Sequence, residues 1–264
     1  MMLWKFYKND EDACSYVYGT IHLATEQAFA HSRLAEKYID RVAHYVSEMN
    51  LDVSGKGLEL AECFQLSEGQ TLFSFFSDKR FGKYRKQILK AFEVDVNDYE
   101  RYCPFYVLNM ISIIGLMQGE THSDRQVLDH HLYHYAQSNG KSLEGLESVD
   151  DQIRIAKAIP MDYQVKSFKK AMKNISAFKK SVEILVQLYA RGDYKSLYKI
   201  SKKSLGQIRP LLLYDRNHFF LDRIEIIVKE HPSFISIGAA HLHGDKGVLA
   251  LFKKRGYKVK RVLV

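Results

Sequence analysis

The sequence has little cysteine, and its cysteines are not spaced for a shared structural role. Three occur in 264 residues, Cys14, Cys63 and Cys103, an odd number with no Cys-x-x-Cys pair. Disulfide-stapled secreted domains and thiolate zinc sites both depend on matched, closely spaced cysteines. Those two classes are excluded, and a reducing compartment is expected.

Long apolar runs and a signal peptide are also missing. The first residues become charged almost at once, at Lys5 and Lys8, with no apolar stretch of the kind found in secretory signals. The longest apolar run, residues 105–117, is interrupted by two polar residues. It falls short of the ~20 residues that a membrane-spanning helix needs. We therefore predict a cytoplasmic protein with no membrane partner.

Linker composition and several familiar catalytic motifs are absent as well. The chain has four prolines and no Gly/Ser-rich tract, so no flexible linker is indicated. It contains neither a Gly-x-Gly-x-x-Gly fingerprint nor a P-loop, and no Gly-x-Ser-x-Gly elbow. The sequence therefore does not favour dinucleotide binding, nucleoside triphosphate binding or Ser-His-Asp catalysis.

Positive charge is concentrated in one stretch. Residues 161–205 contain eleven Lys or Arg against three acidic residues, which equals the net charge of +8 for the whole chain. Between 165 and 188 apolar residues recur every three or four positions, as on one face of a long helix. We interpret the lysines as the solvated face of that helix and expect no nucleic-acid partner.

Strand patterns lie at the two ends of the chain, and helical patterns fill the middle. Runs rich in β-branched and aromatic residues predict strands at 3–7, 14–18, 42–48, 141–146, 233–237 and 257–264. Helices are predicted at 25–40, 215–230 and 245–255, and over much of 58–136, with breaks near Gly69, Gly82, Pro104 and Gly119. Thr25 and Asp215 are the predicted N-cap residues of two of these helices.

This order predicts an α/β fold with a central mixed β-sheet built from both chain ends as two related halves. The largely helical middle section is expected to form a cap, over about 55–138 and 150–210. We expect one domain spanning residues 1–264.

Two similar segments follow strands at opposite ends of the chain. Gly19-Thr20-Ile21-His22 and Gly238-Ala239-Ala240-His241 both read as glycine, two small or apolar residues, then histidine. Glu48 and Glu147 stand at the ends of two further predicted strands. Because ligands of open α/β sheets collect beyond the carboxyl ends of the strands, these four side chains are expected at one side of the sheet.

This residue set suits more than one role. Two neutral imidazoles and a carboxylate can hold a divalent first-row metal, which would activate a bound water. For any single Gly-x-x-His match, a structural histidine satisfied by the backbone is the favoured interpretation, and the paired context narrows that preference without reversing it. We interpret His243, which alternates with His241, as a bystander. His130 and His134 share a helix face without a His-Glu-x-x-His context, and we interpret them as surface or cap residues.

Further short motifs accompany the two Gly-x-x-His segments. They are Ser47-Glu48-Met49-Asn50, Asp129-x-x-Leu132, Gly145-Leu146-Glu147-Ser148, Asp215-Arg216-Asn217 and Gly238-Ala-Ala-His241-Leu-x-Gly244. In order and spacing this set resembles the TraB/PrgY/GumN family, which includes the Tiki proteases. The resemblance implies the α/β fold shared with erythromycin-esterase and ChaN-like proteins.

The resemblance also implies a site. His22, Glu48 and His241 would be the metal ligands, with manganese, cobalt or zinc as the candidate ion. Arg216 would hold a substrate carbonyl or carboxylate, and Asn217 and Asp129 would support the site. Glu147 is a candidate general base only because of its place at a strand end.

The function expected on these grounds is a metal-dependent hydrolase that cleaves a peptide or amide bond with a metal-activated water. Two alternatives remain. One is a non-enzymatic protein that binds or sequesters a peptide in the same cleft. The other is a metal-free, esterase-like hydrolase with His22 as general base. The expected partner is accordingly a peptide or a small amide or ester substrate.

Overall fold

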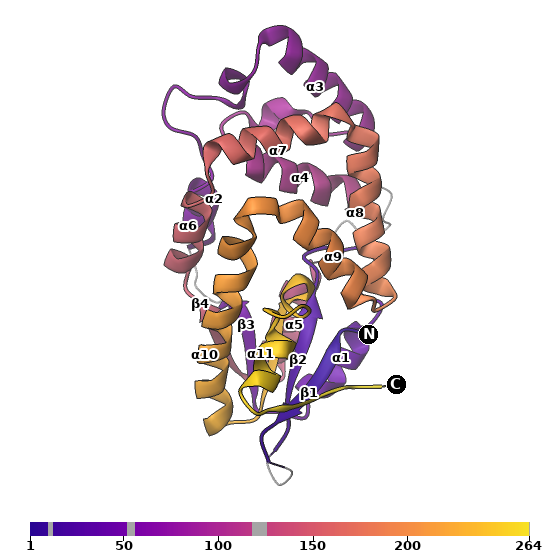
Figure 1. The fold of residues 1–264 in the computed structure, drawn as a ribbon, viewed down its shortest axis with the longest axis vertical. Coiled ribbons are helices and arrows are strands. Elements are labelled where there is room, and N and C mark those ends of the chain that lie inside the picture. The colour runs from indigo at the N-terminus through magenta and orange to yellow at the C-terminus, as the bar shows by residue number, and fades with distance from the viewer. Residues whose placement is uncertain (10–12, 52–55, 118–125, 264) are drawn as a thin grey trace. The chain divides into compact units, whose positions relative to one another are not determined.

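The computed structural model describes the chain apart from residues 10–12, 52–55, 118–125 and 264 (Figure 1). The predicted break near Gly119 lies outside the described residues. Contacts divide the chain into two compact units. Unit 1 comprises residues 1–53, 124–149 and 185–264, unit 2 comprises 54–123 and 150–184, and each has its own hydrophobic core. The single domain expected from the sequence stays a prediction.

Unit 1 contains a six-stranded mixed sheet within the described residues. Its strands are β1 (Leu3–Tyr7), β2 (Ser15–Thr20), β3 (His44–Met49), β4 (Ser142–Glu147), β5 (Ser233–Gly238) and β6 (Lys258–Arg261). The spatial order is β4-β3-β5-β2-β1-β6. The first four in this order are parallel, and β1 is antiparallel to both β2 and β6. The predicted mixed sheet from both chain ends is confirmed.

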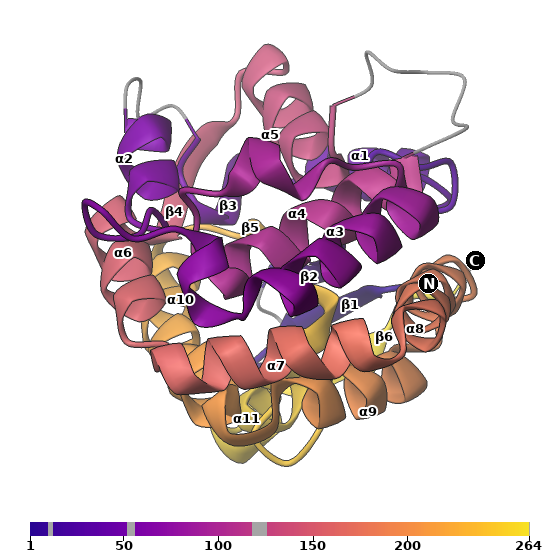
Figure 2. The same ribbon diagram turned by 90° about the horizontal axis from the view of Figure 1, so that it is seen from above.

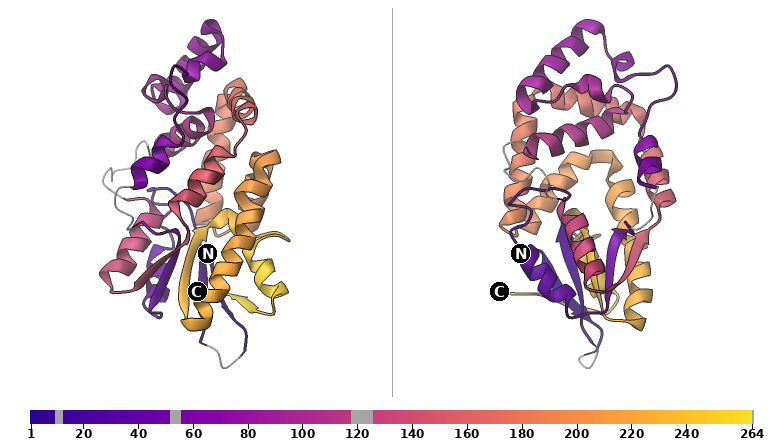
Figure 3. Two further views of the ribbon diagram at one scale, coloured as in Figure 1. Left: turned by 90° about the vertical axis from the view of Figure 1, so that its left-hand side faces the viewer. Right: turned by 180° about the vertical axis from the view of Figure 1, so that it is seen from behind.

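The central strands are buried because helices cover the sheet on both faces. Every residue of β2 is buried, and all of β5 except Gly238, as expected for strands with no solvent-facing side. Helices α1 (Ser32–Ile39) and α5 (Leu128–Ser138) pack together on one face. Helices α10 (Asp215–Glu230) and α11 (Val248–Lys254) contact each other on the other face (Figure 3).

Two predicted N-caps in unit 1 are wrong. Thr25 does not start a helix: its hydroxyl accepts from the Ala28 N–H at 3.3 Å within a turn, and α1 begins only at Ser32. Asp215 does not cap α10, because its φ of −67° and ψ of −40° are already helical. A π-helical turn over Pro210–Tyr214 runs directly into α10, after α9 (Tyr194–Leu205) and a short 3-10 turn.

The regular secondary structure of unit 2 is helical in its described residues, apart from an isolated bridge between Gln65 and Tyr102. It contains α2 (Lys56–Glu62), α3 (Asp78–Phe92), α4 (Pro104–Met117), α7 (Met161–Lys173), nearly all of α6 (Val149–Lys157), the first part of α8 (Ile175–Ala190), and the 3-10 turns Leu72–Phe75 and Val96–Tyr99. Helices α3, α4 and α7 lie side by side (Figure 2) and enclose the core of this unit. The helical middle of the chain is therefore confirmed.

Two details of these helices differ from the prediction. Gly82 lies inside α3 and does not break it, because one glycine costs only about 1 kcal/mol in a helix that buries one face. The long helix predicted over 165–188 is interrupted at Asn174. Its side-chain oxygen accepts from the Ala177 N–H at 3.0 Å, so Asn174 ends α7 and caps α8.

Helix α4 is the most apolar helix of the chain by composition, and it has 14 residues. Across the residues that the structure describes, we find no helix of sufficient length and apolar character to cross a bilayer. The cytoplasmic location stays a prediction.

Candidate functional site

The carboxyl ends of β3 and β4 deliver two glutamates to one arginine. Glu147 is the last residue of β4, Glu48 lies one residue before the end of β3, and Arg216 is in the first turn of α10. The guanidinium donates from Nε and Nη2 to the two Glu147 oxygens at 2.8 and 2.7 Å. Nη2 also donates to Oε2 of Glu48 at 2.7 Å. Arg216 thus bridges two strand ends of the sheet.

Burial and pairing set the charge state of this bridge. Burial opposes ionisation of Arg216, but Glu48 and Glu147 outweigh it and raise the pKa of the guanidinium above its ordinary value. Burial would raise the pKa of Glu48, yet Arg216 and the hydrogen bond from the Gly238 N–H lower it to about 2. Glu48 and Arg216 therefore form a partly buried ion pair at neutral pH.

His241 occupies the other side of the bridge and is held by Asn217. Its Nδ1 lies 2.6 Å from Oδ1 of Asn217, and its Nε2 lies 3.4 Å from Nη1 of Arg216. His241 is only 4% exposed. The pKa of His241 is lowered to about 4, mainly by burial. The positive charge of Arg216 acts in the same direction, and the negative charge of Glu48 acts in the opposite direction. The imidazole is therefore neutral over the physiological pH range.

We call Glu48, Glu147, Arg216, Asn217 and His241 the carboxyl-end cluster. The two motif glycines let this cluster form. A Cβ on Gly238 would lie 3.2 Å from Oε1 of Glu48, which accepts the Gly238 N–H at 2.6 Å. A Cβ on Gly19 would lie 2.5 Å from Cδ1 of Leu242 and 3.1 Å from Cα of Ala239. Both positions require close approach to another part of the chain.

The other motif histidine, His22, has a different partner. Its Nδ1 lies 3.5 Å from Oδ2 of Asp129, and its side chain is 58% exposed. Interaction with Asp129 raises the pKa of His22, with a smaller contribution from the charge of Glu48. Oδ2 of Asp129 is buried and accepts no well-formed hydrogen bond from the described residues. His22 and Asp129 therefore form a loose pair, separate in its direct contacts from the carboxyl-end cluster.

Two supporting groups were not found from the sequence. The Tyr189 hydroxyl donates to the Gly19 carbonyl at 2.8 Å and lies 3.1 Å from the Tyr18 hydroxyl. This fully buried contact anchors the turn that carries His22. The Lys246 carbonyl accepts from Nδ2 of Asn217 at 2.7 Å. Tyr189 looks in the sequence like any apolar-face residue of a helix, and a backbone carbonyl leaves no sequence signal.

The ligand set expected for a metal comes together only in part. His241 Nε2 and Glu48 Oε1 are 3.9 Å apart, and both are suitable donors. His22 instead faces Asp129, and the side of Glu48 toward Nη2 is taken by the Arg216 guanidinium. Among the described residues, no three His, Cys, Asp or Glu side chains converge as metal ligands would. In the arrangement described, these residues do not fit a three-ligand metal site.

The remaining sequence candidates lie in other contacts. His131 Nε2 is 2.7 Å from Glu36, and His134 lies beside Gln137. The His130 ring lies 5.6 Å from that of His22. The ring of His243 makes T-shaped contacts with two tyrosine rings. The centroid distance is 5.3 Å to Tyr194 and 5.5 Å to Tyr198. These four histidines make no described hydrogen bond or ion pair to the carboxyl-end cluster.

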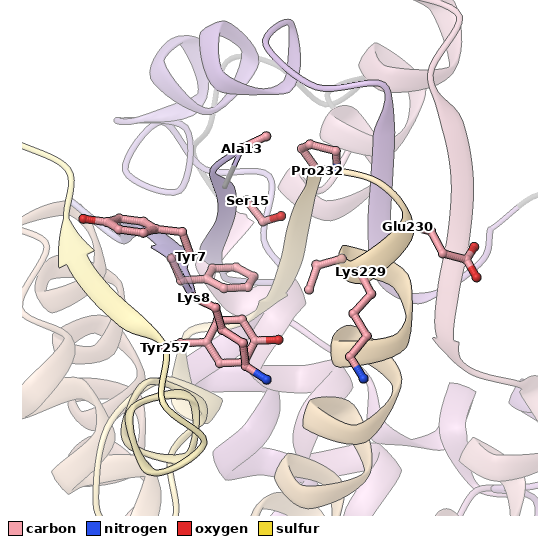
Figure 4. A pocket seen from close by; sticks show the side chains of 10 residues that line it. Tyr7, Lys8, Ala13, Ser15, Lys229, Glu230, Pro232 and Tyr257 are labelled. Carbon is pink, nitrogen blue, oxygen red and sulfur yellow. The ribbon is translucent and has the colours of Figure 1, made fainter. Parts of the chain in front are cut away.

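A pocket of about 330 Å³ lies at the opposite end of the parallel strands (Figure 4). Ser15 begins β2 and Pro232 immediately precedes β5, and both line this pocket. Tyr7, Tyr257 and Lys8 form another wall, with the Lys8 ammonium 4.9 Å from the Tyr257 ring. No residue of the carboxyl-end cluster lines it.

Comparison with known proteins identifies the family of this chain. The model of the TraB/PrgY/gumN family matches residues 2–261. A curated relative, "Metalloprotease TIKI homolog" from Nematostella vectensis, is 22% identical over an alignment 305 positions long. The alignment covers 94% of this chain and 64% of that relative, so the chain spans less than two thirds of its length. No solved structure gives a significant match. The chain belongs to the TraB/PrgY/gumN family.

Proposed function

We propose that this chain is a hydrolase that cleaves a peptide or amide bond at the carboxyl-end cluster. The observation that carries the proposal is a partly buried guanidinium, held by two carboxylates beside a neutral imidazole. It lies at the side of an α/β sheet where ligands bind. Family membership and a relative named a metalloprotease support hydrolysis as the reaction class.

Arg216 is the group proposed to stabilise developing negative charge. Its Nε and Nη2 are held by carboxylates at 2.7–2.8 Å, whereas Nη1 has only long contacts, 3.5 Å to the Leu212 carbonyl and 3.4 Å to His241. A substrate carbonyl oxygen can replace those long contacts at little cost. As water attacks the carbonyl carbon, Nη1 would then donate to the oxyanion.

His22 is the group proposed to move the proton. It is exposed and paired with Asp129, whose negative charge stabilises the imidazolium that forms when His22 takes a proton from the attacking water. The same proton would pass to the leaving amine as the carbon–nitrogen bond breaks. Asp129 in this scheme positions and stabilises His22 without touching the substrate.

A divalent metal ion, manganese, cobalt or zinc, is the second source of activated water in the proposal. Glu48, His241 and His22 are the residues that would hold it, and it would lower the pKa of a bound water toward neutrality. Since Glu48 is paired with Arg216 and His22 with Asp129, loading requires at least one of these pairs to open.

Peptide binding without turnover is the alternative, and one observation favours it. Each nitrogen of the Arg216 guanidinium already lies within 3.5 Å of a protein acceptor. A cluster that is satisfied in this way can serve as a rigid binding surface as readily as a reaction centre.

The test is turnover of a mixed peptide library by the purified protein, followed by mass spectrometry. One arm contains chelator, and the others contain manganese, cobalt or zinc. His22→Ala and Arg216→Met should abolish cleavage, and His134→Ala, a histidine outside the cluster, should leave it intact. Cleavage in chelator assigns water activation to His22, and cleavage only with metal assigns it to the ion. Saturable peptide binding without products would favour the alternative, and cleavage that survives both substitutions would overturn the proposed centre.

A further inference from the structure

Asn217 makes two hydrogen bonds whose polarity is fixed by the backbone. Its Nδ2 lies 2.7 Å from the Lys246 carbonyl, and its Oδ1 lies 2.6 Å from Nδ1 of His241. A carbonyl oxygen can only accept a hydrogen bond. Turning the amide over would bring its oxygen against the carbonyl oxygen of Lys246. The amide nitrogen must therefore face Lys246, and the amide oxygen must face His241.

This orientation decides which nitrogen of His241 carries its proton. An amide oxygen only accepts, so Nδ1 of His241 must donate to it. A neutral imidazole has one N–H, and its other nitrogen therefore presents a lone pair. Asn217 and His241 are 1% and 4% exposed, so water does not compete for the contact. The Phe220 ring packs against the His241 imidazole, with 5.2 Å between the two ring centroids.

The lone pair of Nε2 points at the part of the cluster where the chemistry is proposed. Nε2 is 3.4 Å from Nη1 of Arg216 and 3.9 Å from Oε1 of Glu48. The opposite tautomer would direct an N–H at the guanidinium, and two donors facing each other repel. Asn217 follows Arg216 directly in α10, so one helical turn delivers both the cation and the residue that orients its neighbour.

We infer that Asn217 is a positioning residue that holds His241 in the Nδ1–H tautomer, so that Nε2 offers a lone pair beside Arg216. The groups that this lone pair can receive are donors or cations: the Arg216 N–H, a water, a substrate amide N–H or a metal ion. The significance of this orientation for turnover rests on the proposed function. The tautomer itself does not.

The direct test is the tautomer of His241 at neutral pH, observed by long-range nitrogen–proton NMR on protein labelled with nitrogen-15 in histidine. The His241 signals are identified by their loss in His241→Gln. We expect Nδ1 to carry the proton in the unaltered protein. Asn217→Leu removes the acceptor for Nδ1 and should shift the population toward Nε2–H.

Turnover provides the second readout. Asn217→Leu should lower kcat roughly 10- to 100-fold with a smaller change in KM, as when partners of a ligating histidine are removed. Asn139→Leu, on an exposed asparagine at the end of α5, is the matched control and should change neither readout.

An Nε2–H tautomer in the unaltered protein would overturn the inference, and this measurement needs no variant to fold. An unchanged tautomer in a folded Asn217→Leu would overturn it as well. If the tautomer is as inferred but no peptide is cleaved, the proposed function fails and the positioning role stands.

Discussion

The two Gly-x-x-His segments place similar histidines after neighbouring parallel strands, yet the two side chains differ in almost every property. His22 is exposed and faces the carboxylate of Asp129, whereas His241 is buried and faces the carboxamide of Asn217. The pKa of His22 is raised by its partner, and that of His241 is lowered by burial to about 4.

The difference shows what a repeated motif can and cannot do. Strands β2 and β5 pair in parallel, with Thr20 opposite Gly238, so both motifs end at the same side of the sheet. The pKa of each histidine depends on its burial and on the charge of its partner. The repeated motif thus sets the position of each histidine, and the residue that the neighbouring helix places beside it sets its electrostatic environment.

The largest effect is expected from Arg216→Met, which removes the cation beside His241 and leaves the pairing of His22 with Asp129 untouched. Two carboxylates, one of them only 1% exposed, then lose their counter-ion. Breaking a buried pair of this kind costs about 3–5 kcal/mol. Urea unfolding measures it, and Arg154→Met, in an exposed pair with Asp151, should cost less than about 1 kcal/mol. Equal costs would show that the Arg216 bridge does not stabilise the fold.

The pH dependence of stability should have opposite signs for the two histidines. His241 has a folded-state pKa of about 4 against about 6.5 unfolded. The unfolded state therefore binds more protons between these values, and stability falls as pH drops from 6.5 toward 4. The difference amounts to about 3 kcal/mol at 1.36 kcal/mol per pKa unit.

For His22 the raised pKa means the reverse: its contribution is present at low pH and is lost as pH rises through the folded-state value. Urea unfolding at several pH values should show a shallower acid slope in His241→Gln than in the unaltered protein. His134→Gln serves as the control. A slope unchanged by His241→Gln would mean that His241 is not buried in its neutral form.

The motif glycines should also differ from each other. In Gly19→Ala the new methyl meets a Leu242 methyl and the Ala239 backbone, so the chain must shift, at about 1–3 kcal/mol. In Gly238→Ala the nearest atom is Oε1 of Glu48 at 3.2 Å, a side chain that can adjust slightly, and we expect less than about 1 kcal/mol. Thermal unfolding of both variants ranks them, and Gly82→Ala, in open space inside α3, should instead raise stability by up to about 1 kcal/mol. A larger loss for Gly238→Ala would reverse the expected order.

The smallest effect is expected from Asp129→Asn, which makes the partner of His22 neutral like that of His241. Because Asp129 is the largest cause of the raised value, the pKa of His22 should fall. NMR titration of the histidine ring protons measures it. Asp40→Asn changes an exposed carboxylate that accepts a hydrogen bond from the Tyr135 hydroxyl, and it should leave the pKa of His22 unchanged. A His22 titration that does not respond to Asp129→Asn would show that the two residues are not a functional pair.

Local signals predicted some helix boundaries and failed at others for identifiable reasons. The helix ending at Glu230 and the strands near Glu48 and Glu147 follow from periodicity and Pro232. Thr25 was predicted as an N-cap, and the helix break at Asn174 was missed, because polar residues of this kind cap turns or helices equally well. Only the surrounding packing chooses between those uses.

The sequence by itself determined the order of strands and helices and the arrival of two histidines and two glutamates at the carboxyl side of one sheet. Both depend on local periodicity and on the rule that parallel strands end together. Only the tertiary structure decided the pairings: Arg216 with both glutamates, Asn217 with His241, Asp129 with His22. These contacts join residues from 24 to 168 positions apart. Their distances are set by how α10 and α5 pack on the sheet, which the periodicity of a single segment does not encode.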